Sequence, residues 1–447
     1  MKFGMKGRGA LGAAALAAGA LLLSACGSSS GDPASSESGP ASAAPVEISY
    51  LVDNGEQTKL ITDALVAAFE KKYPNITVTV ETRPGGGDGD NLVKTKLSTG
   101  EMSDVFWYNV GSLLQALDPA TNLVAQTDEP WQSTVDQGFK DAASVDGQVY
   151  AGPLGPAMGG GILYSKTIYD KLGLTIPTTW DEFMANNAKI KAAGIAPVIQ
   201  SYGDTWTSQL FVLADYHNVA AVNPDWASQY TANDPNAKYV DDPALKGFQR
   251  LQEVFDAGYL NEDFASIKLD QALADLSSGK GAQYPMLTFA IGNLTGLDKA
   301  NAQNIGFFGQ PGDDASKNGM TLWMPAGLYI PKTTEGDKLD AAKKFIAFAV
   351  SPEGCDVQSA AVAPTGPYVI QGCTIPADSP LAVTQMQDIV SAGKSTPALE
   401  FLSPVKGPNL EKITVEVGSG ISKAEDGAAR YDEDVKKQAQ QLGLPGW

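Results

Sequence analysis

The most constraining feature of the chain is a strand–helix–strand pattern that begins at residue 46. "VEISYLV" (46–52) alternates apolar and other residues, which is typical of a strand, and "NITVTVE" (75–81) does the same. Between them, "EQTKLITDALVAAFEKKYP" (56–74) repeats apolar residues at helical spacing and stops at a proline. Two strands joined by a helix within so short a stretch form a βαβ unit, which requires a parallel sheet.

The alternation of strands and helices continues in both halves of the chain. "DVFWYN" (104–109) and "IAPVIQ" (195–200) are further predicted strands, and helices are predicted over 179–193, 337–354 and 409–440. No internal repeat is visible in the sequence. The pattern therefore predicts an α/β fold, and the length allows two domains of ordinary size.

The N-terminus has the parts of a bacterial lipoprotein signal in their usual order. Lys2, Lys6 and Arg8 precede an uncharged stretch, 10–23, which is shorter than the roughly 20 residues that span a bilayer. "LSAC" (23–26) then resembles a lipobox, in which the chain is cut before the cysteine and the thiol carries lipid. A plain signal peptide with an incidental cysteine is the alternative.

The residues after this motif are mainly Ser, Gly, Ala and Pro, a composition that cannot bury enough apolar surface to fold. We therefore expect a signal peptide over 1–25, a lipid anchor on Cys26 and a flexible tether over 26–45. This arrangement places the protein on the outer face of the bacterial cell membrane.

Charge and histidine content restrict the possible functions. The formal net charge is −19, and removing 1–25 takes away three basic residues and no acid. An acidic chain repels nucleic acid and anionic headgroups, so neither is an expected partner. His217 is the one histidine, which argues against histidine-based metal sites and Ser-His-Asp catalysis. We expect no metal, no cofactor and no catalytic residues.

Two cysteines remain beyond the predicted anchor, Cys355 and Cys373. In an oxidising compartment such a pair often forms a disulfide, and the Pro- and Gly-containing segment between them can turn back. Two buried, reduced thiols are the alternative.

Candidate binding residues lie in the loops after the predicted strands, because ligands of open α/β sheets bind beyond the carboxyl ends of strands. Asn109 ends one strand, in which Trp107 and Tyr108 point to opposite faces, so that one of the two belongs to the core. Asp204 and Trp206 follow another strand in polar surroundings. Two more candidates, Asn54 and Glu56, follow the first strand, although Glu56 can equally serve as a helix-start acid.

Several conspicuous residues have structural explanations instead. Trp180 stands in the first turn of a helix that Thr179 and Glu182 open as a capping box, so we expect it to pack. His217 follows a predicted helix and is expected to be a satisfied helical histidine. The glycines of "GPAMGGG" (155–161) allow the backbone to bend or to approach a ligand, and no phosphate-binding pattern accompanies them.

Three blocks carry a resemblance to a known family: "STGEMSDVFWYNVGSLLQALDP" (98–119), "YAGPLGPAMGGGILYSKTIYDKLGLTIPTTWDEF" (150–183) and "LADLSSGKGAQYPM" (273–286). They resemble the extracellular solute-binding proteins of carbohydrate ABC importers, the group that includes maltose-binding protein. Ser165 and "QYPMLTF" (283–289) depart from the family pattern, which leaves the particular sugar open.

The resemblance implies a two-lobed periplasmic-binding-protein-like fold of class II, with the ligand cleft between the lobes. The chain would cross between lobes near 153–160 and 322–328, where Pro and Gly cluster. The implied division gives the N-terminal lobe residues 46–155 and 325–385, and the C-terminal lobe residues 156–324 and 386–447.

The resemblance also implies a function without covalent chemistry. The protein would capture a sugar or oligosaccharide in the cleft and deliver it to the permease of an ABC importer, acting as a monomer. A sugar needs aromatic surfaces for its C–H faces and hydrogen-bonding side chains for its hydroxyls. The candidate substrate-binding residues are Asn54, Glu56, Trp107, Tyr108, Asn109, Met158, Asp204, Trp206, Thr288 and Trp323.

Two other functions remain open at this point. One is a binding protein for an amine or a peptide, which an acidic cleft would suit. The other is a lipid-anchored glycoside hydrolase, which would need two carboxylates about 5–10 Å apart. Acidic residues are plentiful, so the sequence leaves such a pair possible, although no GxSxG motif is present.

Overall fold

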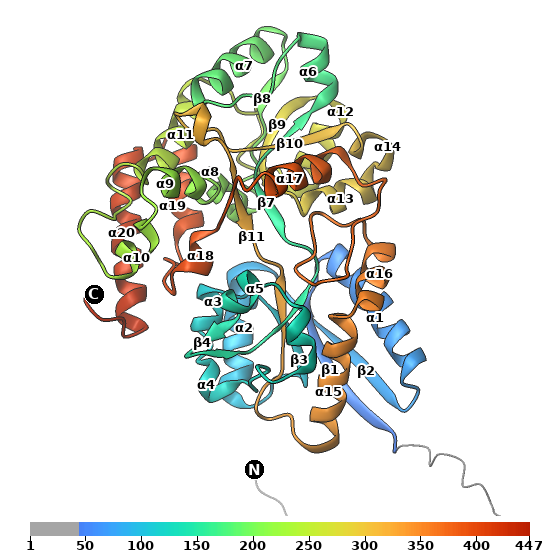
Figure 1. Cartoon of the computed structure of the whole chain (residues 1–447). Coiled ribbons are helices and arrows are strands. Elements are labelled where there is room, and N and C mark those ends of the chain that lie inside the picture. Colours follow the sequence, from blue (N-terminus) through green and yellow to red (C-terminus); the bar gives the residue numbers. More distant parts are fainter. Residues whose placement is uncertain (1–43) are drawn as a thin grey trace, which may run out of the picture. The chain divides into compact units, whose positions relative to one another are not determined.

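The computed structural model describes residues 44–447, so the predicted signal peptide, Cys26 and nearly all of the predicted tether lie outside the described residues. Most strands of the described part belong to two separate sheets (Figure 1). We call residues 44–155 and 326–373 the first lobe, and residues 158–323 and 381–447 the second lobe. Within 44–447, no helix is long and apolar enough to cross a membrane.

The sheet of the first lobe has five strands in the order β2-β1-β3-β12-β6. The central strand β1 pairs in parallel with both β2 and β3, so the predicted βαβ unit is confirmed. β12 runs antiparallel to β3 and to β6 and brings the chain back from the second lobe. The strands are β1 (Val46–Asp53), β2 (Ile76–Arg83), β3 (Val105–Tyr108), β6 (Gly152–Leu154) and β12 (Ala326–Tyr329).

Helices bury both faces of this sheet. On one face, the ring of Phe345 lies 5.2 Å from that of Tyr50 and 5.1 Å from that of Phe69. On the other face, Phe106 and Tyr108 are fully buried in a second apolar cluster. The helices of this lobe are α1 (Glu56–Lys72), α2 (Gly86–Thr99), α3 (Ser112–Gln115), α4 (Pro119–Asn122), η1 (Pro130–Thr134), α5 (Gln137–Ala142), α15 (Gly336–Ala349) and α16 (Pro352–Ala361), and β4 (Ser144–Val145) and β5 (Gln148–Val149) form a small hairpin.

The sheet of the second lobe is built around the long strand β7. β7 pairs antiparallel with β9 on one side and with β10 and β11 on the other, and the strand order is β13-β11-β7-β9-β8. These strands are β7 (Met158–Ser165), β8 (Ala196–Val198), β9 (Gly281–Leu287), β10 (Ile305–Gly309), β11 (Met320–Trp323) and β13 (Ser395–Pro397).

Many helices surround this second sheet (Figure 1). α7 begins with the predicted capping box, because Thr179 accepts from the Glu182 amide and the Glu182 carboxylate accepts from the Thr179 amide. The helices are α6 (Lys166–Leu172), α7 (Trp180–Ala192), η2 (Thr205–Gln209), α8 (Leu210–Leu213), α9 (Tyr216–Val222), α10 (Trp226–Thr231), α11 (Leu245–Asp256), α12 (Leu269–Ser278), α13 (Ala290–Leu297), α14 (Lys299–Ala302), η3 (Ala315–Lys317), α17 (Leu381–Ser391), α18 (Leu399–Leu402), α19 (Leu410–Gly418) and α20 (Ala424–Gln441).

Three segments connect the lobes. β6 continues into β7, β11 continues into β12, and a third segment leads from Cys373 to α17. The expected boundary at residue 385 falls inside α17, where the Gln385 side chain accepts a hydrogen bond from the Phe307 amide of β10 at 2.8 Å. The chain has therefore returned to the second sheet by Leu381.

A disulfide joins Cys355 of α16 to Cys373 across a sequence separation of 18 residues. It fastens the segment that follows α16 to the first lobe. Ile370 of this segment is buried in the same apolar cluster as Cys355. In the chain-entropy account, such a bridge stabilises the fold by roughly 3 kcal/mol.

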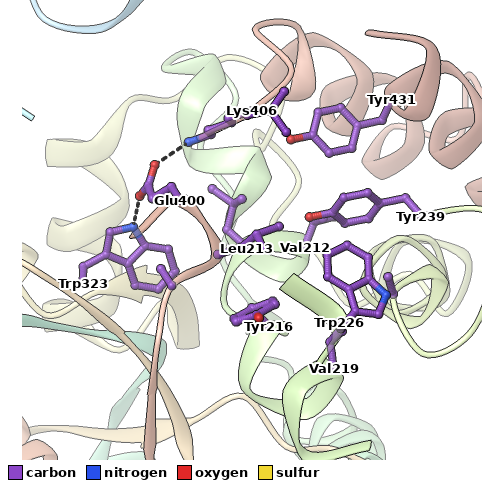
Figure 2. Close-up of a pocket in the computed structure, with 14 residues that line it drawn as sticks. Val212, Leu213, Tyr216, Val219, Trp226, Tyr239, Trp323, Glu400, Lys406 and Tyr431 are labelled. Carbon is purple, nitrogen blue, oxygen red and sulfur yellow. Dashed lines mark hydrogen bonds and ion pairs between the residues drawn. The ribbon is translucent and has the colours of Figure 1, made fainter. Parts of the chain in front are cut away.

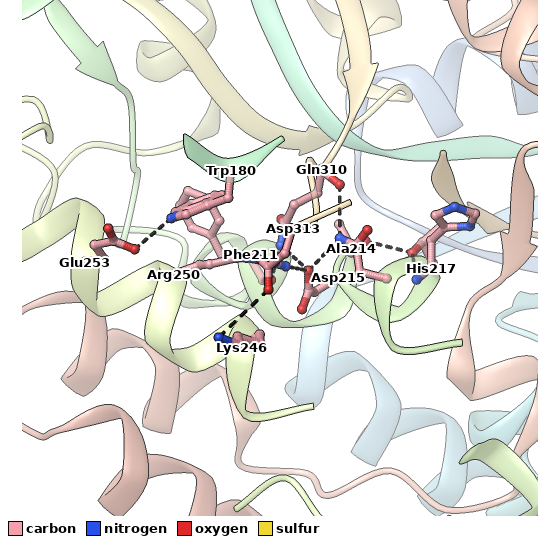
Figure 3. A network of polar contacts seen from close by, with 12 residues as sticks. Trp180, Phe211, Ala214, Asp215, His217, Lys246, Arg250, Glu253, Gln310 and Asp313 are labelled. Carbon is pink, nitrogen blue, oxygen red and sulfur yellow. Dashed lines mark hydrogen bonds and ion pairs between the residues drawn. The ribbon is translucent and has the colours of Figure 1, made fainter. Parts of the chain in front are cut away.

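A buried polar network holds helices of the second lobe together (Figure 3). The guanidinium of Arg250 in α11 pairs with Asp215 and, at 2.9 Å, with Asp313. Trp180 donates its indole N–H to Glu253 at 2.7 Å and packs beside Phe183, as expected for a structural tryptophan.

His217 also has structural partners. Its Nδ1 lies 2.9 Å from Thr396 Oγ1, and its Nε2 lies 3.0 Å from the Lys317 carbonyl oxygen. Burial lowers the pKa of His217. The residue therefore joins α9 to β13, as a satisfied histidine does.

Candidate binding cleft

A cavity of about 610 Å³ is lined by residues of both lobes. The carboxyl ends of β1 and β3 open into it from the first lobe, and η2, α13 and the end of β11 border it from the second lobe. The position follows from the parallel pairing of β1 and β3, because the loops after parallel neighbours emerge at the same edge of a sheet.

The loop between β1 and α1 supplies polar side chains to the cavity. Asp53 organises this loop, since its carboxylate accepts from the Gly55 amide at 2.6 Å and from the Thr58 hydroxyl at 3.0 Å. Asn54 and Glu56 are exposed and line the cavity beside it. A carboxylate in the first turn of a helix is favoured by the helix dipole, so Glu56 also supports α1.

The end of β3 contributes Trp107 and Asn109 to the cavity wall. The guanidinium of Arg83 lies 5.5 Å from the ring centroids of both Trp107 and Tyr108. This distance permits cation–π attraction, which helps to hold the Trp107 ring in place. The main chain of Asn109 is fixed as well, because its carbonyl oxygen accepts from the Tyr329 hydroxyl at 2.9 Å.

The carboxyl group of Asp90 lies in the same part of the first lobe. Burial raises the pKa of Asp90, although the positive charges of Arg83 and Lys406 act in the opposite direction. Lys406 belongs to the second lobe, so charges of the two lobes act on one another beside the cavity.

Aromatic rings dominate the side of the cavity that the second lobe forms. Trp206 of η2 is half-buried, and its ring centroid lies 5.9 Å from that of Phe289. Leu210 and Leu213 of α8 continue this apolar surface. Phe401 lines the cavity from α18, and Tyr368 adds a ring from the first lobe.

Trp323, at the end of β11, is held on two sides (Figure 2). Its indole N–H donates to Glu400 Oε1 at 2.5 Å, and Lys406 Nζ lies 3.1 Å from Glu400 Oε2. Below the ring stands Gly160, where an added Cβ would come within 2.2 Å of the indole. The absence of a side chain at Gly160 therefore lets the Trp323 ring pack closely against β7.

A second, much smaller pocket of about 20 Å³ adjoins the cavity (Figure 2). Leu213, Trp323, Glu400 and Lys406 line both spaces. The rest of its wall is aromatic and aliphatic, so it has room for about one water molecule and little else.

Most of the predicted site residues meet at the cavity. Those that line it are Asn54, Glu56, Trp107, Asn109, Met158, Trp206 and Trp323. They come from segments as far apart in the chain as β1 and β11, as the rule for strand-end loops leads one to expect.

Three predicted residues do not line the cavity, and these predictions are corrected. Tyr108 is fully buried, because strand alternation turns it into the core face opposite Trp107. The Asp204 carboxylate accepts from the Leu269 amide at the start of α12. Thr288 is fully buried and its hydroxyl accepts from the Gly159 amide, which joins β9 to β7.

Several lining residues were not predicted from the sequence because they do not follow a predicted strand. Tyr368 follows α16, and Phe289 lies directly before α13. Glu400, Phe401 and Lys406 lie near the short helix α18, late in the chain. No sequence pattern predicted this last group, because these residues come close to the end of β11 only in the folded structure.

The cavity carries charged groups of both signs. The carboxylates of Asp53, Glu56 and Glu400 and the ammonium of Lys406 line it. Asp53 accepts hydrogen bonds within its own loop, and Glu400 is paired with Lys406. Among residues 44–447, no group of three or more His, Cys, Asp or Glu side chains is arranged to hold a metal ion.

Comparison with known proteins places the chain in a family. Residues 54–354 match the family of bacterial extracellular solute-binding proteins, and the chain belongs to that family. A multiple sugar-binding protein of Streptococcus mutans is 25% identical over 73% of this chain and 75% of its own length. The melibiose/raffinose/stachyose-binding protein MelE of Bacillus subtilis is 22% identical over 64% of this chain and 66% of its own.

Solved structures share the fold. A chitin oligosaccharide binding protein superposes with a TM-score of 0.75, at 20% identity, over 89% of this chain and 99% of that one. The binding protein RafE in complex with raffinose superposes with a TM-score of 0.71, at 21% identity, over the same shares. The two-lobed α/β architecture of periplasmic binding proteins is thus confirmed.

Proposed function

We propose that this solute-binding protein captures a sugar or oligosaccharide in the cleft and delivers it to the permease of an ABC importer. The observation that carries the proposal is the composition of the cavity, in which polar loop residues of the first lobe stand beside aromatic rings that come mostly, but not solely, from the second lobe. Relatives that bind multiple sugars or melibiose, raffinose and stachyose support it.

The chemistry of a sugar matches these two kinds of surface. The C–H faces of a pyranose ring can stack on Trp206 and Trp107, and its hydroxyls can bond to Asn54 and Asn109. Binding and release then require only non-covalent contacts. We propose that the protein leaves its ligand chemically unchanged, in keeping with its membership of a family of solute-binding proteins.

The fold also gives the proposed function a mechanical step. Three connecting segments join the lobes, and each contains proline beside glycine or alanine, at Gly155-Pro156, Pro325-Ala326 and Pro376-Ala377. Changes of backbone torsion in a few such residues can open and close two lobes. Ligand affinity would include the free energy of closure, and the closed form would be the one that the permease binds.

We further propose that the protein is a monomeric lipoprotein on the outer face of the cell membrane. The lipobox-like "LSAC" ending at Cys26 supports this anchor. Two or three acyl chains of a lipoprotein would hold it stably, whereas one would not. A Cys26→Ser variant should leave the membrane fraction, and retention at the wild-type level would contradict the anchor.

A cationic solute is the second candidate, because carboxylates outnumber ammonium groups in the cavity wall. Glu56 is the lining carboxylate left for such a ligand, as Asp53 caps its own loop and Glu400 is paired. One free carboxylate at the rim favours the cation less than the aromatic surface favours the sugar.

A thermal-shift screen distinguishes these candidates. Raffinose, stachyose, melibiose, maltotriose and chitotriose form one arm, and polyamines and short basic peptides form the other. Because a ligand that binds only the folded state raises Tm, a rise with at least one sugar is expected. A rise with the amines or peptides alone would overturn the sugar proposal, and release of a chromophore from nitrophenyl glycosides would indicate a hydrolase.

A further inference from the structure

Glu400 and Lys406 form an ion pair that reaches the cavity from the second lobe. Their side chains are 15% and 23% exposed, and both line the cleft. They come from the segment around α18, which follows the short edge strand β13 and is not a part of the connecting segments. The inference drawn from this pair rests on the proposed function and names two residues that would determine which sugar the protein binds.

The bonding capacity of the pair is only partly used. A carboxylate offers about four acceptor positions and an ammonium three donors. Glu400 accepts one hydrogen bond from Trp323 and one from Lys406, and among the described residues Lys406 donates to Glu400. The pair therefore retains acceptors and donors side by side, which suits hydroxyl groups, since each hydroxyl both donates and accepts.

The Glu400 carboxylate is also held in one orientation. Trp323 Nε1 and Lys406 Nζ bind its two different oxygens, as Figure 2 shows. The Trp323 ring is fixed in turn by its close packing on Gly160. A carboxylate fixed in this way loses little side-chain entropy when it binds a ligand, so its hydrogen bonds contribute more to affinity.

The backbone of Glu400 lies against the first lobe. Gly111 of the first lobe has φ 73°, and a Cβ added there would come within 2.3 Å of the Glu400 carbonyl oxygen. The neighbouring Phe401 packs against the apolar cluster of the first lobe that contains Leu114 and Phe139. The pair thus stands where the lobes touch, next to a ligand held between them.

We propose that Glu400 and Lys406 determine sugar specificity as a unit, by binding neighbouring hydroxyl groups of the carbohydrate. Trp323 acts as the positioning residue that orients Glu400. A ligand with adjacent hydroxyls in reach of both groups is preferred over one in which these positions are deoxy or acylated.

The test measures Kd by calorimetry for the member of the five-sugar panel that binds the wild type most tightly. Glu400→Ala should weaken binding about 10- to 100-fold, as expected when hydrogen bonds to a charged group are lost. Lys406→Met should weaken it by a similar factor. Because the pair acts as a unit, the double variant should lose about as much as one single variant.

Two controls separate a role in binding from a role in folding. Leu402→Ala changes an exposed residue of the same helix and should leave both Kd and Tm near the wild-type values. Glu400→Gln keeps an acceptor for the Trp323 indole, and its loss of affinity should be smaller than that of Glu400→Ala. The ¹⁵N-indole resonance of Trp323 should move in Glu400→Ala without any sugar present.

The outcomes distinguish this inference from the proposed function. Wild-type protein that binds no member of the panel would overturn both. Wild-type binding with unchanged affinity in Glu400→Ala, or with fully additive losses in the double variant, would overturn the inference alone. An unmoved Trp323 resonance in Glu400→Ala would overturn the positioning role of Trp323.

Discussion

The two lobes present different chemistry to the same cavity. The first lobe contributes hydrogen-bonding side chains of strand-end loops, among them Asn54 and Asn109, together with the rings of Trp107 and Tyr368 and several aliphatic side chains. The second contributes Trp206, Phe289 and Trp323, whose rings are set by mutual packing or by a hydrogen bond. We therefore expect a partial division of roles, in which the first lobe supplies most of the neutral hydrogen bonds to the hydroxyl groups of a sugar and the second lobe most of the aromatic surface for its C–H faces.

The lobes also differ in how they are held together. The segment of the first lobe that borders the cavity is tied to α16 by the disulfide between Cys355 and Cys373. Helices of the second lobe are joined through the buried pair of Arg250 and Asp215, to which the exposed Asp313 adds a further carboxylate. A covalent bridge is lost under reducing conditions, whereas the charged cluster responds to mutation and pH.

The first expected effect is on the stability of the first lobe. Cys355→Ser combined with Cys373→Ser should lower the free energy of unfolding by roughly 3 kcal/mol, because the unfolded chain gains the freedom of an open loop. Urea denaturation measures this loss. The wild type under reducing conditions is the matched comparison, and equal midpoints for bridged and unbridged protein would contradict the prediction.

The second expected effect tests the aromatic side of the cavity. Trp206→Ala should weaken sugar binding by about 5- to 30-fold, the equivalent of 1–2 kcal/mol for one aromatic contact. The apo protein should melt near the wild-type temperature, because Trp206 is only half-buried. Fluorescence titration gives the affinity.

The buried Trp180 is the matched control for this substitution. Trp180→Ala should lower stability by about 3–5 kcal/mol, as removal of a large core side chain does, with a smaller effect on affinity once folded. Equal affinities for Trp206→Ala and the wild type would show that Trp206 does not stack on the sugar and would leave Trp107 as the candidate.

The third prediction tests the polar side of the cavity. Asn109→Ala should weaken sugar binding by about 2- to 10-fold, which corresponds to the loss of one neutral hydrogen bond. The backbone should stay in place because Tyr329 holds the Asn109 carbonyl. Calorimetry measures the Kd of this variant and of Asn91→Ala, an exposed control on α2. A loss of affinity in Asn109→Ala larger than that in Trp206→Ala would contradict the proposed roles of the two lobes.

The last prediction concerns pH, and the stability of the two lobes should depend on pH with opposite signs. In the second lobe, burial raises the pKa of Asp432 to about 6, although the amides of Tyr239 and Val240 donate to its carboxylate. In the window from pH 3.8 to about 6 the folded chain keeps a proton that the unfolded chain releases. The contribution of Asp432 to stability is therefore lost as pH rises through this window.

Asp104 of the first lobe behaves in the opposite way. Burial alone would raise its pKa, but hydrogen bonds from Ser49 and Lys338 bring the pKa below its usual value. Its contribution is present above pH 3.8 and is lost as pH falls below that value. Thermal melts of Asp432→Asn and Asp104→Asn between pH 3 and 7 should change slope in opposite directions, and parallel changes would contradict the assignment.

The sequence was sufficient for the fold class and for part of the cleft. Strand and helix periodicity predicted the βαβ unit, and the rule for strand-end loops located Asn109 and Trp206. It could not show which way a polar side chain turns. Asp204 lies in a suitable loop, yet its carboxylate is used to cap α12.

Site residues that come from distant segments of the chain could not be predicted from the sequence for a different reason. Glu400 and Lys406 meet Trp323 only because β11 pairs with β13 and carries the following helix, α18, to the cavity. Thr288 was misplaced since the pairing of β7 with β9, which buries it, cannot be read from local periodicity.

The most direct test of the central claim is a crystal structure with the sugar that gives the largest thermal shift. We expect a sugar between the lobes, with a C–H face on Trp206 and hydroxyls bonded to Asn109 and to the Glu400–Lys406 pair. A sugar bound outside this cavity, or one that contacts a single lobe only, would contradict the proposed binding site.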